Sequence, residues 1–257
     1  MWVRFLLTSI ALSFFAYGQV KKDENRYLRI IPLANKAEFR EGPLKNGIRT
    51  MLPPRPGEVP PFQIRVKDEV PQKAGLTLRL DRISRFVAIG PKIQQIEISE
   101  AQKAGGKAWY TFKAPQAQRT LAVLYRDHKK LDWFNPKSLI LKDDAKIFPV
   151  GSARFVNVSD RTLAMIFKLV KNGKSVEEIK GLAPGKTYTR PLSAAGEMAK
   201  IVIYEKGKQP DEMEEIFLNQ IRTEEKERLN LFFYKNSAKA GVRRVILPEK
   251  IPALPKL

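Results

Sequence analysis

The residue types that carry most enzyme chemistry are nearly absent from this chain of 257 residues, which has no Cys and a single His, His128. The absence of Cys excludes disulfides, thiolate zinc sites, iron–sulfur clusters and cysteine nucleophiles. One His cannot form a His-rich zinc site. It could serve as the base of a Ser-His-Asp site, but Lys129 and Lys130 follow it directly in a polar stretch. We therefore interpret His128 as a solvated loop residue.

Paired carboxylates are the remaining route to catalysis, because a glycosidase needs two of them facing one cleft. The chain offers two adjacent pairs, Asp143-Asp144 and Asp211-Glu212. Neighbouring residues of a strand point to opposite faces, so adjacency does not make a catalytic pair, and we expect both to be solvated loop residues. The acidic run 211–215 also lacks the glycine-punctuated spacing of a calcium loop. The sequence thus predicts no catalytic residue, no metal site and no cofactor, and we expect a protein that is not an enzyme.

The net charge favours an anionic partner. The chain has 47 Lys and Arg against 27 Asp and Glu, a formal charge of +20, and such an excess raises the affinity for polyanions whatever the fold. The candidate contacts are Lys129, Lys130, Arg243 and Arg244, which stand at corresponding places in two similar segments. The alternative is that scattered cations protect sheet edges and solvated faces. The sequence leaves both interpretations open.

The N-terminus has the pattern of a secretory signal peptide at residues 1–18. Arg4 supplies the positive charge, residues 5–15 are mostly apolar, and small residues precede a cleavage site between Gly18 and Gln19. The apolar run is too short for a comfortable bilayer span, and no later segment reaches that length. The alternative is an uncleaved anchor. We expect an exported protein, periplasmic or at the cell surface, and export without Cys favours a bacterial one.

Apolar residues recur mostly with a period of two, which predicts strands. Residues 62–67 and 76–80 alternate cleanly, whereas the Pro-rich segment 34–61 is expected to be irregular. We read 215–221 and 228–234 as the two strands of a hairpin. Trp133-Phe134 is the best candidate for an exposed aromatic pair. The other predicted strands are 108–113, 121–125, 138–142, 154–158, 163–170, 201–204 and 242–247.

Two segments of the chain echo each other. Residues 123–127 (VLYRD) resemble 232–236 (FFYKN) at an offset of 109, and 139–141 resemble 245–247 at an offset of 106. In both places a polar loop separates the two matching pieces. A duplicated β-sandwich explains both offsets with one assumption, and chance likeness between aromatic-rich strands is the alternative.

The stretch Phe148–Asp160, followed by a strand, an Asn-Gly hairpin turn and the Leu-Ala-Pro-Gly turn 182–185, resembles the opening of the Ig-like β-sandwich domain of secreted bacterial proteins of unknown function. The resemblance covers about residues 108–257. It implies a fold and export, and it brings no catalytic residues.

Together these observations predict an all-β protein with two Ig-like antiparallel β-sandwich domains after a cleaved signal peptide. The expected divisions are 1–18 for the signal, 19–147 for the first domain and 148–257 for the second. We expect a non-enzymatic structural or interaction protein of the bacterial envelope or periplasm, with no membrane span in its mature chain. The alternatives are a binding module for anionic envelope polymers (polysaccharide, phosphate-rich polymer or nucleic acid) and, less favoured, a carbohydrate-active hydrolase.

Overall fold

The computed structural model of the chain is all-β, and the residues that it describes contain no helix. The structure describes residues 25–251 and 254, apart from 68, 70–74, 102–106, 128, 131, 172–173, 193–196, 205–213, 225 and 238. The predicted signal peptide with Gly18 and Gln19, His128 and the pair Asp211-Glu212 lie outside the described residues. Several sheets agree with a β-sandwich architecture, but the expectation of purely antiparallel sheets is corrected, because two of the sheets each contain one parallel pair of strands.

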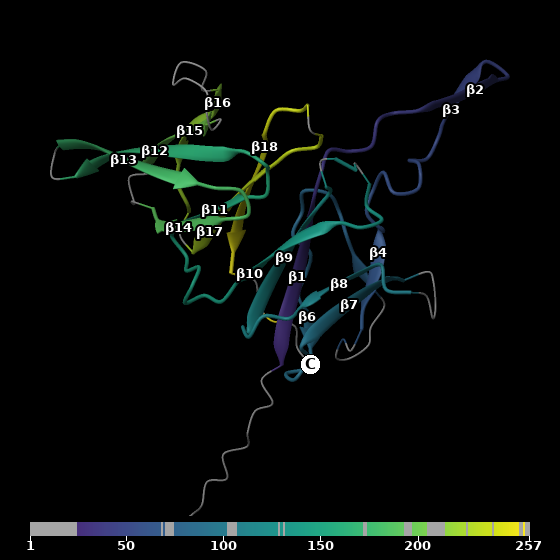
Figure 1. Cartoon of the computed structure of the whole chain (residues 1–257), viewed down its shortest axis with the longest axis horizontal. Coiled ribbons are helices and arrows are strands. Elements are labelled where there is room, and N and C mark those ends of the chain that lie inside the picture. The colour runs from purple at the N-terminus through teal and green to yellow at the C-terminus, as the bar shows by residue number, and fades with distance from the viewer. Residues whose placement is uncertain are drawn as a thin grey trace, which may run out of the picture.

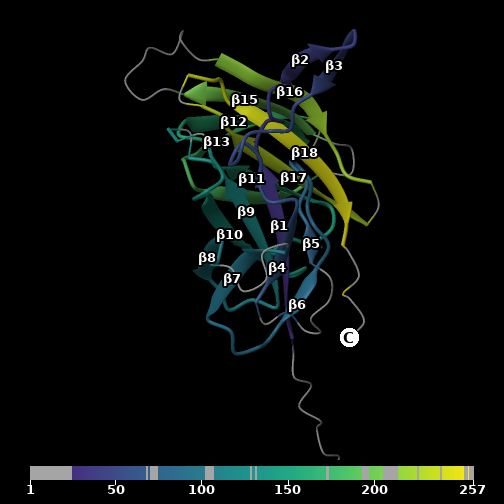
Figure 2. The same ribbon diagram turned by 90° about the vertical axis from the view of Figure 1, so that its right-hand side faces the viewer.

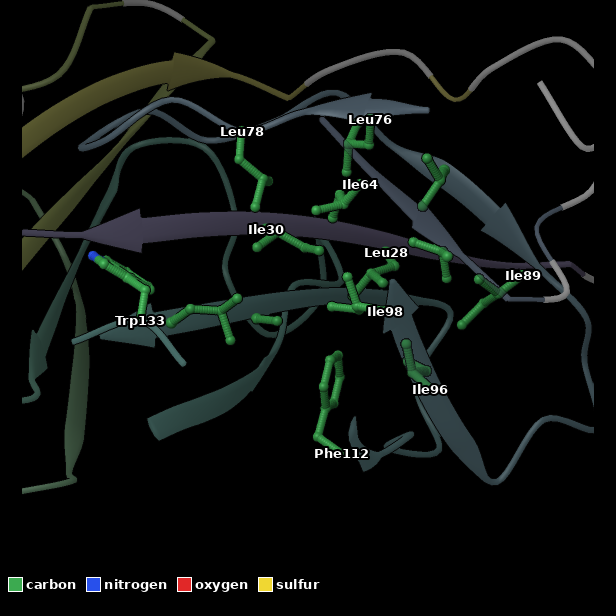
Figure 3. Close-up of a cluster of buried hydrophobic side chains, with 14 of the residues drawn as sticks. Leu28, Ile30, Ile64, Leu76, Leu78, Ile89, Ile96, Ile98, Phe112 and Trp133 are labelled. Carbon is green, nitrogen blue, oxygen red and sulfur yellow. The ribbon is translucent and has the colours of Figure 1, made fainter. Parts of the chain in front are cut away.

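The first half of the chain, whose strands lie between residues 26 and 142, forms two four-stranded sheets that pack face to face. We call the sheet that faces the other half of the chain the inner sheet, and the other the outer sheet. Its inner sheet has the order β10 (Lys137–Lys142), β9 (Arg119–Tyr125), β1 (Arg26–Leu33), β6 (Val87–Ile89). Its outer sheet has the order β5 (Leu76–Thr77), β4 (Gln63–Val66), β7 (Gln95–Glu100), β8 (Tyr110–Lys113). Leu28 and Ile30 of β1 face Ile64 and Ile98 of the outer sheet across the core, and Trp133 lies at one end of it (Figure 3).

The second half repeats this arrangement. Its inner sheet has the order β14 (Thr187–Pro191), β11 (Ser152–Asn157), β17 (Glu227–Tyr234), β18 (Arg243–Lys250). Its outer sheet has the order β13 (Lys174–Leu182), β12 (Thr162–Lys171), β15 (Glu197–Tyr204), β16 (Glu214–Ile221). Between the two sheets lies a second core that includes Phe155, Phe167 and Phe233.

The two halves have the same topology, and the pairing registers show which residues correspond. In both inner sheets the first strand of the half runs parallel to the last strand but one, β1 to β9 and β11 to β17. Val123 pairs with Leu139 between β9 and β10, and Phe232 pairs with Val245 between β17 and β18. Phe232 follows Val123 by 109 residues and Val245 follows Leu139 by 106 residues, so these pairs agree with the two offsets found in the sequence. The echoing segments therefore occupy the same places in the two sheets.

The inner sheets of the two halves pack on each other, so that four sheets follow one another through the molecule (Figures 1 and 2). The apolar seam between them is a third core. Corresponding residues of the two halves belong to it, such as Ile31 and Val156, and Val123 and Phe232. Because β1 faces one core on each side, its residues from Tyr27 to Leu33 are all buried. That strand shows no alternation in sequence, which is why the period-two pattern missed it.

Three further expectations from the sequence are corrected. The strands β16 and β17 do not form a hairpin, because β16 pairs with β15 in the outer sheet and β17 with β11 and β18 in the inner sheet. Trp133 is buried, and only its neighbour Phe134 is exposed. Within the Pro-rich segment, β2 (Glu41–Lys45) and β3 (Ile48–Met51) form a hairpin that extends away from the sheets (Figure 1).

Candidate functional site

A cluster of charged side chains lies in the seam between the two halves. The carboxylate of Asp143 is fully buried and is ion-paired with Arg29, Arg154 and Arg228. Its oxygens lie 2.9 Å from Arg154 Nη2 and 3.1 Å from Arg228 Nη2. Glu249 completes the cluster, with 2.7 Å to Arg29 Nη1 and 2.9 Å to Arg228 Nη2. The interpretation of Asp143 as a solvated loop residue was wrong, because that residue sits where the two inner sheets meet.

The duplication explains the composition of this cluster. Arg29 stands two residues before Ile31, and Arg154 stands two residues before the corresponding Val156. Asp143 and Glu249 likewise each follow the corresponding leucines of β10 and β18 by two residues. Each half thus contributes an arginine and a carboxylate from the same places, and the second half adds Arg228. The pairs Arg29–Glu249 and Arg154–Asp143 cross the seam.

An aromatic ring lies over each guanidinium group of the cluster, Phe148 in the second half of the chain and Phe86 in the first. Arg154 and Arg228 lie 4.2 and 4.6 Å from the ring centre of Phe148, and Arg29 lies 4.7 Å from that of Phe86. Burial opposes ionisation of Asp143, but the three arginines outweigh it and hold the pKa of that carboxyl below its usual range. Burial lowers the pKa of Arg154 to about 10. The cluster therefore joins the halves as a buried set of ion pairs, and two of its members, Arg29 and Glu249, also line a groove at the surface.

An open groove of about 650 Å³ begins where this cluster reaches the surface. One wall is the segment 81–86 of the first half, and the other is the end of β18, residues 247–250. Arg82, Arg85 and Lys250 line the groove and are exposed. A second hollow of about 300 Å³ shares residues 82–85 with the groove and adds the exposed Arg79. Exposed cations from both halves therefore border two hollows that share the segment 82–85.

The groove is lined by four cations and two carboxylates, so its lining keeps a net positive charge. Glu249 is held by ion pairs to Arg29 and Arg228. Burial raises the pKa of Asp81 to about 6, opposed by hydrogen bonds from the backbone and from the Tyr234 hydroxyl, 3.3 Å away. Arg85 lies near Glu69, whose pKa burial raises. The exposed charge of the groove is accordingly positive.

The four predicted polyanion contacts lie elsewhere. Lys130 lines a separate hollow of about 360 Å³ with Tyr110 and Tyr125, and the exposed Lys129 stands beside it in the same turn. Arg243 and Arg244 begin β18 on the second half, where Arg244 donates to the Ile216 carbonyl at 2.7 Å and covers the ring of Phe217. Their role stays a prediction.

Sequence reasoning did not single out the cations that line the groove. One pattern was available to find them, since Arg79, Arg82 and Arg85 recur every three residues. Nothing in the sequence places Lys250 beside them, because it is more than 160 positions away. Only the packing of the two inner sheets brings β18 to this segment.

The described residues offer neither a metal-binding cluster nor a membrane-spanning helix. The described part of the chain contains no group of three or more His, Asp or Glu side chains arranged to hold a metal ion. It likewise contains no helix that is long and apolar enough to cross a bilayer.

Comparison with known proteins identifies no family. No family model and no curated protein matches the chain. Two solved structures resemble it weakly, at 9% identity each: the cytotoxin suilysin from Streptococcus suis, with a TM-score of 0.26 over 41% of this chain and 24% of that one, and pneumolysin, described as a sugar binding protein, with a TM-score of 0.27 over 67% and 31%. The chain spans less than a third of either length, and the similarity is too low to support an argument about function.

Proposed function

We propose that this chain is a non-enzymatic interaction protein of the bacterial envelope, exported by its N-terminal signal, and that its ligand is an anionic polymer bound along the groove between its halves. In this proposal residues 19–147 and 148–257 are two Ig-like sandwich domains joined by the buried ion cluster. The single observation that carries the ligand class is the set of exposed cations, Arg79, Arg82, Arg85 and Lys250, around the groove and the hollow that shares residues 82–85 with it.

The shape and charge of the groove favour a chain-like ligand over a small molecule. It is open along its length, and its exposed cations stand at intervals on both walls. Guanidinium groups bind phosphate and carboxylate through paired N–H donors, whereas an ammonium acts as a point charge. Ile83, Leu247 and Pro248 supply apolar floor between the cations, which suits the ring faces of a sugar polymer.

The test is titration with two anionic polymers of known chemistry, polyphosphate and polygalacturonate, and with uncharged dextran as the reference. The triple variant Arg82→Ser, Arg85→Ser, Lys250→Ser removes the central cations of the groove. We expect it to weaken binding of one or both polyanions at least tenfold. Loss of three phosphate contacts should also reduce the slope of log K against log salt by about 2, at roughly 0.7 per contact for a flexible polyanion.

The control removes the same charge elsewhere. Lys92, Lys113 and Lys186 are exposed and lie outside the groove, so Lys→Ser at all three leaves the groove intact at an equal net charge. We expect this control to bind within about twofold of the wild type, because general attraction is screened over about 10 Å at 0.1 M salt. Equal losses in the two triple variants, or no binding of either polyanion at low salt, would contradict the proposal.

A carbohydrate-active hydrolase is the second candidate, because Asp81 and Glu249 line the same groove. Their environments differ in the manner of a general acid and an ionised carboxylate, since burial raises the pKa of Asp81 to about 6 and Glu249 is ion-paired. Turnover of an acidic polysaccharide that disappears in Asp81→Asn, with binding retained, would favour this candidate over a binding protein.

A further inference from the structure

The outward faces of the two outer sheets differ, although the sheets have the same topology. On β13, β12, β15 and β16 the outward positions carry Ile166, Ile179, Met198 and Leu218, and the last three are 63%, 42% and 57% exposed. On the matching sheet of the first half every outward position is polar or charged. These positions are Gln63, Arg65, Thr77, Gln95, Glu97, Ser99, Thr111 and Lys113.

The exposed apolar side chains of the second half form one surface, which we call the outer apolar face. Ile166 pairs with Ile179 on one side and with Lys200 on the other, and Lys200 pairs with Leu218. Met198 stands beside Lys168 in the next row. Clusters of exposed apolar residues with a polar rim are typical of protein interaction sites.

The charges of the outer apolar face balance one another. Lys168 pairs across the strands with Glu177, and Lys200 Nζ lies 2.9 Å from Glu215 Oε2. The face is therefore neutral in a chain whose formal charge is +20. A neutral face of paired charges attracts neither a polyanion nor a strongly acidic protein, and it adds no local repulsion when two copies of this positively charged chain meet there.

We propose that the outer apolar face is a self-association surface, on which a second copy of this chain packs its own outer apolar face about a two-fold axis. The inner sheets already show that faces of this fold pack on each other, since corresponding residues of the two halves belong to the seam between them. The proposal does not depend on the groove or its ligand.

The size of the face sets the strength of the association. Four strands of eight to ten residues, at a spacing of about 4.8 Å and a rise of about 3.3 Å per residue, make a face of roughly 19 by 26 Å, or about 500 Å². Two such faces bury about 1,000 Å², which is the lower end of the range for specific complexes. We therefore expect a weak dimer that forms and dissociates with concentration.

Sedimentation velocity of the purified chain between about 1 and about 200 µM measures this association, with dissociation constants in the micromolar range expected for a weak interface. Leu218→Lys and Ile179→Lys each place a charge in the face without touching a core, and each should raise the dimer dissociation constant roughly tenfold or more. The matched control is Thr111→Lys, which adds the same charge to the outward face of the first half. It should leave the dimer unchanged.

The absence of Cys allows a direct test of geometry. Met198→Cys creates a unique thiol on β15, a central strand of the face, and a dimer whose two-fold axis passes beside the start of β15 brings it near its own copy. Oxidation or a short bis-maleimide should then give a covalent dimer, whereas Gln95→Cys on the other outer face should stay monomeric. A wild-type chain that is monomeric at the highest concentration, or a dimer that Thr111→Lys weakens as much as Leu218→Lys, would overturn the proposal.

Discussion

Replacing Asp143 by Asn tests whether the seam depends on its buried charges. The carboxylate is fully buried and pairs with three arginines, so the amide leaves Arg29, Arg154 and Arg228 with only Glu249 as an anionic partner. Removing one member of a buried ion cluster costs about 3–5 kcal/mol, because the remaining charges stay desolvated without compensation. At about 2–4 °C per kcal/mol for a chain of this size, the melting temperature should fall by about 6–20 °C.

The comparison is an exposed ion pair of the same chemistry. Glu41 and Arg49 pair on the β2–β3 hairpin with side chains that are 47% and 64% exposed, and Glu41→Gln should cost less than about 1 kcal/mol. Urea denaturation at pH 7 gives both values. The double variant Asp143→Asn, Arg154→Met removes one uncompensated cation and should recover about 1–2 kcal/mol of the loss.

The effect of Asp143 also has a predicted pH dependence. The arginines hold its folded pKa below the unfolded value, so its contribution is present above about pH 4 and is lost as pH falls through the folded pKa. The difference in unfolding free energy between wild type and Asp143→Asn, measured at intervals of about one pH unit, should therefore be constant from about pH 5 to 8 and shrink below about pH 4. A loss no larger than that of Glu41→Gln would refute the view that this cluster holds the halves together.

Two further predictions concern single residues near the seam and in the first core. Burial raises the folded pKa of Asp81 to about 6, so its contribution to stability is present at low pH and is lost as pH rises through about 6. Asp81→Asn, which tolerates the residue's φ of 56°, should therefore flatten the change in urea midpoint between about pH 5 and 7, and an unchanged slope would contradict this. Trp133 is 1% exposed and Phe134 is 65% exposed, so Trp133→Ala should cost about 3–5 kcal/mol and Phe134→Ala under about 0.5 kcal/mol by urea denaturation. Similar costs for both would show that the first core does not depend on Trp133.

The sequence was sufficient for the local structure wherever a strand has one wet face. Residues 63–66 and 163–168 alternate because one set of side chains faces a core and the other faces outward. The same reasoning overlooked β1, since Ile30 faces the first core and Ile31 faces the seam, and a strand buried on both faces has no period.

The sequence also carried the duplication. The offsets of 109 and 106 select the register partners Val123–Leu139 and Phe232–Val245, because corresponding strands must bury corresponding side chains. In contrast, the local pattern of apolar residues does not predict which neighbouring strands pair. It joined β16 to β17, which belong to different sheets.

The packing of the two halves on each other is visible only in the tertiary structure. Asp143 follows a strand and precedes a turn, and nothing local distinguishes it from the half-exposed Asp144 beside it. Its burial against Arg154 and Arg228 arises because two inner sheets pack face to face, and the same packing brings Lys250 to Arg82 and Arg85. Charge content and strand texture are properties of the chain, whereas the meeting of charges far apart in sequence depends on long-range apolar packing that no local pattern encodes.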